Sequence, residues 1–401
     1  MRLATANTFD ASIATLQRRQ QQLQTSQQQL ITGKKVNQAS DDPTSAARAE
    51  RALSAIGKID ANQRALEASR NGLTLSEGAL GDANEMLQQI RESMVAAGNA
   101  SYSDAERVGL SNKLAGLRTQ MLSIANRPDG AGSYLFAGQG SGSAPFLDQA
   151  GGVAFEGVPG VISTGSGESF ALTVDGRQAW EQARSGNGSF VTSPDPSAVA
   201  PPQGWIDAGH VTNPALLTGN PYEIQISGTA PAAQSWTITN TASGASATGA
   251  YRSGKSIEFE GMAVAVSSEP VDGDKFTITP STNNLKVFDV LDGLIAQLRT
   301  PNRSGAAITQ SNISGLRDVD AVMGALQSVR SQIGEGLNNL DGSETRMAAL
   351  KQYSQSEKSA AEDLDMVNGI SNFQNQQTGY DTALKTYAMV QRLSLFQYIN
   401  V

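Results

Sequence analysis

The 401-residue chain contains no cysteine and only one histidine. Their scarcity excludes thiol nucleophiles, disulfide frameworks and zinc fingers, and almost every histidine-based catalytic or metal site. Aromatic residues make up 5% and hydrophobic residues 39% of the chain, so we expect a lean core for this length. No run reaches the ~18–20 apolar residues of a membrane span, and the N-terminus has no apolar run of signal-peptide type. We therefore expect no membrane span and no cleaved export signal.

Positive charge is also scarce, because the net charge is −8. Such an acidic chain does not favour nucleic-acid binding through a global basic field. Residues 138–281 hold 13 acidic and 5 basic side chains, so this zone carries the whole excess and the flanks are neutral. Neutral flanks tolerate packing against copies of themselves, whereas an acidic middle zone favours solvent.

Proline is nearly missing from both flanks. Only four of the 14 prolines lie outside residues 138–279, namely Pro43, Pro128, Pro280 and Pro301. Because proline is excluded from helix interiors, this distribution predicts helices, then a non-helical zone, then helices.

The N-terminal flank carries heptad spacing. A first seam contains Phe9, Ile13, Leu16, Leu23 and Leu30, with glutamine at two further core positions. Asp42 and Pro43 provide an N-cap and a first helical residue for a long helix to about residue 97. Its seven-residue repeat predicts a bundle core at Leu66, Leu73, Leu80 and Leu87. Ser103 and Glu106 form a capping-box pattern before a third helix, which completes a hairpin.

The C-terminal flank mirrors this pattern. A seven-residue repeat runs from Val319 to Met347, and a last helix carries apolar residues on more than one face. A terminal helix with so much apolar surface docks on another element, either another molecule or its own chain. The predicted assembly positions of this helix are Tyr380, Leu384, Tyr387, Leu393 and Phe396.

The middle zone predicts β-structure. Alternating apolar residues mark strands at 222–226, 236–239, 257–260, 262–266 and 276–278, with turn residues in the gaps. The pair Asp175–Gly176 predicts a hairpin turn after a strand at 170–174. Residues 182–221 show little pattern and are expected to form a long loop.

Three features of the sequence could suggest a metal or phosphate site, and each has a simpler structural explanation. His210 is expected at the surface, and Asp272 and Asp274 in a turn, because the rest of a calcium-loop pattern is missing. The glycine-rich segment 138–142 leads into Pro145 and not into a helix, so it is expected to be a linker. We therefore expect no enzyme activity, no cofactor and no metal site.

These patterns predict an α+β protein in which N- and C-terminal arms form a long heptad helical bundle, with a β-rich domain inserted centrally in the sequence. Five parts are expected: an N-terminal assembly helix and turn (1–43), a helical hairpin (44–137), an acidic β-rich outer domain (138–281), returning helices (282–368) and a C-terminal assembly helix (369–401).

Four segments carry a family resemblance. The run from Leu30 to Pro43, LITGKKVNQASDDP, precedes the long helix, and YLFAG (134–138) follows the helical hairpin. The segments from Gly261 to Asp289 and from Ser394 to Ile399 add to the match, with departures at Phe396, Gln397 and Ile399. The chain resembles the flagellin superfamily, and its hook–filament junction branch more than flagellin itself.

The resemblance implies a structural subunit of the bacterial flagellum, exported without a cleaved signal and needed for filament assembly and motility. Its implied partners are its own copies in a ring, the first hook-associated protein, flagellin, and an export chaperone on the C-terminal helix. Ile13, Leu16, Leu23 and Leu30 would pack with Tyr380, Leu384, Tyr387 and Leu393, and Gly33, Lys34, Asp41, Asp42 and Pro43 would set the turn between helices. Two alternatives stay open: a flagellin or minor filament subunit, and an outer domain that binds glycans or surfaces.

Overall fold

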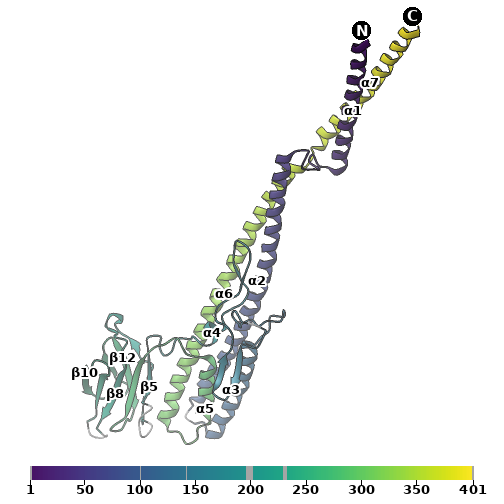
Figure 1. Ribbon diagram of the computed structural model, residues 1–401. Helices are drawn as coiled ribbons and strands as arrows, with labels where there is room; N and C mark the ends of the chain where they lie inside the picture. Colours follow the sequence, from purple (N-terminus) through teal and green to yellow (C-terminus); the bar gives the residue numbers. More distant parts are fainter. Residues whose placement is uncertain (1, 100, 141, 196–201, 229–232, 400–401) are drawn as a thin grey trace. The chain divides into compact units, whose positions relative to one another are not determined.

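The computed structural model describes residues 2–99, 101–140, 142–195, 202–228 and 233–399, with side chains from residue 9 to residue 391 (Figure 1). The chain divides into two compact units. Met1–Arg64 and Ser343–Val401 form the first, called the terminal unit here, and Ala65–Gly342 form the second, called the central unit.

Long helices dominate both units. They are α1 (Arg2–Thr32), α2 (Pro43–Ala97), α3 (Asp104–Ala125), α5 (Val287–Arg299), α6 (Gly305–Glu362) and α7 (Met366–Ile399). Helix α2 spans the predicted range, and the capping box of Ser103 and Glu106 begins α3. Helix α7 begins at Met366, because the side chain of Asp365 accepts hydrogen bonds from the amides of Val367 and Asn368.

In the central unit, α2 and α6 run antiparallel. Arg70 pairs with Asp341 at 2.6 Å and Arg91 with Asp320 at 2.7 Å, so rising numbers on α2 meet falling numbers on α6. Between these pairs, Arg330 contacts Glu77. The predicted core positions Leu66, Leu73, Leu80 and Leu87 are 0–5% exposed. Burial of these leucines stabilises the packing of the helices. The exposed ion pairs contribute little energy, but they favour one register of α2 against α6.

Gly72 on α2 allows another segment of the backbone to approach the helix closely. A Cβ at this position would lie 2.6 Å from the carbonyl oxygen of Leu172, and the hydroxyl of Ser69 donates to the carbonyl of Ala171. The segment 171–172 therefore rests directly on α2. The helix-propensity cost of Gly72 is offset by this close approach of two backbones.

Around the helices, short elements surround an aromatic cluster. These elements are β1 (Phe146–Gln149), β2 (Gly152–Phe155), β3 (Ser163–Thr164), β4 (Phe170–Ala171) and α4 (Gly176–Trp180). Trp180 is fully buried between Phe136, Phe146 and Phe288, with ring centroids 5.6–6.1 Å apart. Arg118 on α3 pairs with Asp148 of β1 at 2.6 Å and with Asp292 of α5 at 2.5 Å. The hydrogen bonds that its guanidinium donates to both carboxylates raise its pKa.

The β-rich domain is a sandwich of two antiparallel sheets. One sheet has the order β10-β9-β8-β13-β5, and the other has the order β11-β12-β6, with β7 also on β12. A shared core of apolar side chains from both sheets, including Ile224, Phe276, Ile206 and Val264, is 0–4% exposed. The strands are β5 (Phe190–Pro194), β6 (Gly204–Ile206), β7 (His210–Val211), β8 (Tyr222–Ser227), β9 (Ser235–Asn240), β10 (Ser246–Ala250), β11 (Ser256–Phe259), β12 (Met262–Ser268) and β13 (Lys275–Pro280).

Three local predictions were wrong. Residues 182–221 are not one long loop, because β5, β6, β7 and a 3₁₀ turn (Pro214–Leu216) lie there, and exposed His210 lies on β7. These strands are two to five residues long and pair with distant β12 and β13, so no local periodicity marks them.

The other two errors concern turns. Asp175 does not form a hairpin turn: its side chain accepts from the amides of Arg177 and Gln178 and caps α4. Gly138 is not part of a flexible linker, because it has φ +65° and a Cβ there would lie 2.0 Å from the carbonyl oxygen of Val158. The fold-class prediction itself is confirmed: long helices precede and follow a β-rich insertion in the sequence.

Candidate assembly surface

The turn after α1 is fixed by the end of α6, within the terminal unit. Gly33 has φ +70° and its carbonyl accepts from the amide of Leu364 at 2.9 Å. The amide of Lys35 donates to the carbonyl of Glu362 at 2.7 Å, and the ammonium of Lys34 pairs with the Glu362 carboxylate at 2.7 Å. The hydrogen bond that Lys34 donates to the Glu362 carboxylate raises the pKa of Lys34. The left-handed conformation favours glycine at position 33.

The two aspartates before α2 have separate roles. Asp41 accepts from the amides of Asn37 and Gln38 at 3.0 and 2.9 Å and so holds the loop. Asp42 accepts from the amides of Thr44 and Ser45 at 3.0 and 3.1 Å and caps α2. Hydrogen bonds from Ser45 lower the pKa of Asp42, because they stabilise the ionised carboxylate.

Helices α1 and α7 lie side by side and antiparallel (Figure 1). Phe9 and Tyr387 form an edge-to-face contact with centroids 6.1 Å apart, and Ser26 donates to Gln376 at 2.7 Å. Gly369 packs next to Leu30, where a Cβ would lie 3.3 Å from a methyl group. The two ends of the chain therefore form one helical hairpin.

This hairpin leaves apolar side chains uncovered. Leu16, Leu23, Leu30, Tyr380 and Tyr387 are half-buried. Ile13 and Leu384 are each 40% exposed. Leu393 and Phe396 lie outside the residues whose side chains are described. The specific pairing of these positions stays a prediction.

Further exposed apolar residues lie on the terminal unit, and the sequence pointed only to some of those on the last helix. They are 45–80% exposed: Ile31, Leu53, Leu350, Tyr353, Met366, Val367, Ile370, Met389 and Val390. Large exposed apolar side chains are typical of surfaces that pack against another molecule when they lie together. The sequence did indicate exposed apolar surface on the last helix, because the apolar residues of that helix occupy more than one face. The partner of the turn, residues 360–364, gave no such signal, because two of its contacts join backbone groups and the ion pair of Lys34 with Glu362 links residues far apart in the sequence.

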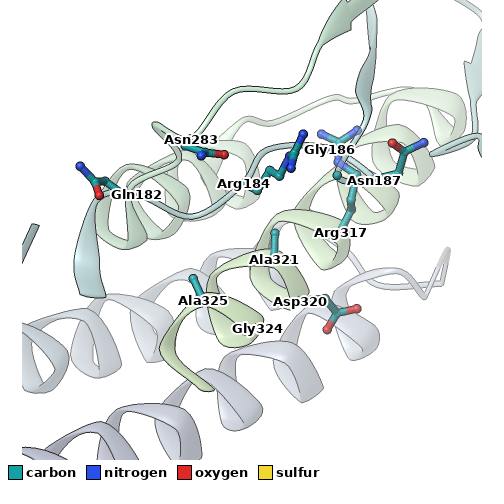
Figure 2. Close-up of a pocket in the computed structure, with 11 residues that line it drawn as sticks. Gln182, Arg184, Gly186, Asn187, Asn283, Arg317, Asp320, Ala321, Gly324 and Ala325 are labelled. Carbon is teal, nitrogen blue, oxygen red and sulfur yellow. The ribbon is translucent and has the colours of Figure 1, made fainter. Parts of the chain in front are cut away.

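A second feature is an open groove of about 760 Å³ in the central unit. Figure 2 shows it between the segment that carries Gln182, Arg184 and Asn187 and the part of α6 from Arg317 to Ala325. Arg317 donates to the carbonyl of Thr192 at 3.0 Å and pairs with Asp318. Asp320 forms an ion pair with Arg91. The two charged side chains that α6 contributes to the groove, Arg317 and Asp320, therefore already have partners within the chain.

Within residues 9–391, allowing for the gaps in the description, no three histidine, aspartate or glutamate side chains are grouped to hold a metal ion. No helix in the described part of the chain has the length and hydrophobicity needed to cross a bilayer.

Comparison with known proteins identifies the class. Residues 5–141 match the bacterial flagellin N-terminal helical region. The flagellar hook-associated protein 3 of Escherichia coli K12 is 24% identical over 381 residues, which span 92% of this chain and 90% of that protein. The flagellar junction protein FlgL of Legionella pneumophila has a crystal structure that is 27% identical, with a TM-score of 0.69, covering 79% of this chain and all of that one.

The chain is therefore similar, in sequence and in fold, to structural proteins of the bacterial flagellum. Its similarity to a hook-associated protein and to a flagellar junction protein extends along most of the chain. Flagellins match over a much smaller share: the B-type flagellin of Pseudomonas aeruginosa is 31% identical over 33% of this chain and 28% of that protein. The resemblance of the turn and the helical arms is confirmed.

Proposed function

We propose that the chain is the adaptor subunit that joins the hook, through the first hook-associated protein, to the flagellin filament. The observation that carries the proposal is the similarity to junction proteins along nearly the whole chain, including the β-rich insertion. Flagellins share only part of this length, so a subunit of the filament body fits less well.

The uncovered α1–α7 hairpin supports a ring of copies. Ile13 on α1 and Leu384 on α7 remain 40% exposed after the two helices pair. Copies packed side by side would bury these side chains and gain roughly 25 cal/mol for each Å² of apolar surface removed from water. The neutral flanks allow such packing, while the acidic outer domain stays in solvent.

We also propose an export route and a non-enzymatic role. A chain whose terminal helices lack full partners until assembly is suited to export in an unfolded state, with a chaperone on the C-terminal helix before secretion. The function proposed is mechanical coupling without catalysis.

Deleting the gene and examining the cells by electron microscopy tests this function. We expect hooks without filaments and flagellin in the medium, because export continues while nothing anchors the filament. Restoring the wild-type gene is the control and should restore filaments. Intact filaments and normal motility in the deletion strain would contradict the proposal.

A further inference from the structure

A second pocket of the central unit, of about 510 Å³, lies between the β-sandwich and the helices. The end of β5 and Gly204 line it from the sandwich side. Gln297 of α5, Arg303 and the first turns of α6 line it from the helical side. Arg317 lines both this pocket and the groove in Figure 2. A volume of this size is typical of a site for a small molecule.

Arg303 brings to this pocket a positive charge that no carboxylate balances. Its guanidinium donates to the hydroxyl of Ser311 at 2.7 Å and to the backbone carbonyl of Gln297 at 3.3 Å, and it forms no ion pair with a described residue. Burial lowers the pKa of Arg303, and repulsion from the nearby Arg107 lowers it further. An anion bound next to Arg303 would stabilise its charged form.

Arg107 adds to this excess of positive charge. Its side chain is only 7% exposed, and its Nε and Nη1 atoms have no hydrogen-bond partner among the described residues. Its ion pair with Asp104 is long, at 3.9 Å, and the Asp104 carboxylate also accepts from the amide of Asn302. Arg107 and Arg303 together therefore carry more positive charge than their ion pairs neutralise, and buried charge of this kind favours a counter-ion.

Ser314 on α6 offers a hydroxyl donor to the same pocket. The side chain of Gln310 is 6% exposed and is held at both ends: its oxygen accepts from the amide of Ile206 at 2.8 Å, and its nitrogen donates to Ser314 at 3.2 Å. Ser314 thus accepts one hydrogen bond, while its own proton is donated to no described residue. A ligand in the pocket can accept that proton.

Gln297 adds an acceptor to these donors. Its side-chain oxygen is buried and has no hydrogen-bond partner among the described residues, so a ligand that also donates would satisfy it. Inorganic phosphate combines negative charge with a P–O–H group at neutral pH. Sulfate and carboxylates are fully deprotonated there, and a phosphate monoester has lost most of its second proton.

We propose that this pocket binds inorganic phosphate. Arg303 and Ser314 donate to its oxygens, Gln297 accepts from its P–O–H group, and the charge of Arg107 strengthens the attraction. Among the described residues that line the pocket, Asp195 is the one carboxylate without a place in an ion pair named above, and it already has a partner within the chain. The pocket belongs to the central unit, so the proposal does not depend on what the terminal helices bind.

Calorimetric titration of the purified, full-length chain at constant ionic strength tests the ligand. Inorganic phosphate should bind to the wild type, and sulfate and glucose 6-phosphate should bind about tenfold less tightly, because they lack the proton that Gln297 accepts. No binding of phosphate, or equal or tighter binding of either of the other two anions, would overturn the proposal.

Three variants test the position of the site. Ser314→Ala removes one hydroxyl and should weaken phosphate binding about threefold to tenfold, whereas Arg303→Gln should weaken it at least about tenfold because it removes the charge. Arg184→Gln is the matched control and should bind as the wild type does, because Arg184 is exposed and lines the neighbouring groove instead. Far-ultraviolet circular dichroism checks that each variant is folded. Unchanged affinity in folded Ser314→Ala, or equal losses in Arg303→Gln and Arg184→Gln, would contradict the assignment.

Discussion

Replacing Leu384 with aspartate should abolish filament attachment while leaving the subunit folded. Leu384 lies on α7 and is 40% exposed in the single chain, so the charge meets water before assembly. In the proposed ring, neighbouring copies remove this position from water. An unpaired carboxylate buried there costs several kcal/mol per copy, and the ring repeats that cost in every subunit.

The measurement is motility together with electron microscopy of cells that express Leu384→Asp in place of the wild type. Asn375→Asp is the matched control, because it adds the same charge at an exposed polar position of the same helix. The variant chain should still appear in the medium, which separates failed assembly from failed export. Normal filaments with Leu384→Asp would show that this helix face is not an interface.

Trp180→Ala should give the largest loss of stability in the central unit. The indole is fully buried and stacks on Phe288 with centroids 5.8 Å apart and planes inclined by 13°. Its removal leaves a cavity beneath α4, β1 and α5 that rigid neighbours cannot fill. Such truncations destabilise by about 3–5 kcal/mol.

Trp180→Phe separates packing from polarity. The indole Nε1 has no hydrogen-bond partner among the described residues, so losing it carries no hydrogen-bond cost. Phenylalanine keeps most of the ring contacts, and its variant should lie much closer to wild type in urea unfolding followed by circular dichroism. Equal losses of unfolding free energy in Trp180→Ala and Trp180→Phe would contradict this account, because the ring contacts that phenylalanine keeps would then contribute no stability.

The helical half of the fold could be predicted because its signals are local and repeat. The heptad positions of α2, such as Leu66 and Leu80, recur often enough to specify a buried stripe. The caps at Asp42 and at Ser103 are short patterns with one geometric meaning. Full-length similarity to junction proteins then supported the functional reading of the same segments.

What sequence could not predict depends on distant partners. The strand at 190–194 exists because β13 pairs with it. Asp175 caps α4, although the dipeptide Asp175–Gly176 is typical of a hairpin turn. Gly72 and Gly138 look like flexible positions until the backbone that approaches each is known. In the candidate interface, Phe9 was on the predicted seam, whereas the contact of Lys35 with Glu362 is a backbone pairing without a sequence pattern.

The position of the chain in the flagellum tests the central claim most directly. A single cysteine at exposed Ser256 can be labelled with biotin and gold, since the chain has no cysteine of its own, and cells with the unlabelled wild-type chain show the background. Electron micrographs of labelled flagella should show gold at one place only, between the hook and the filament. Gold spread along the filament, or its absence from that junction, would contradict the role proposed here.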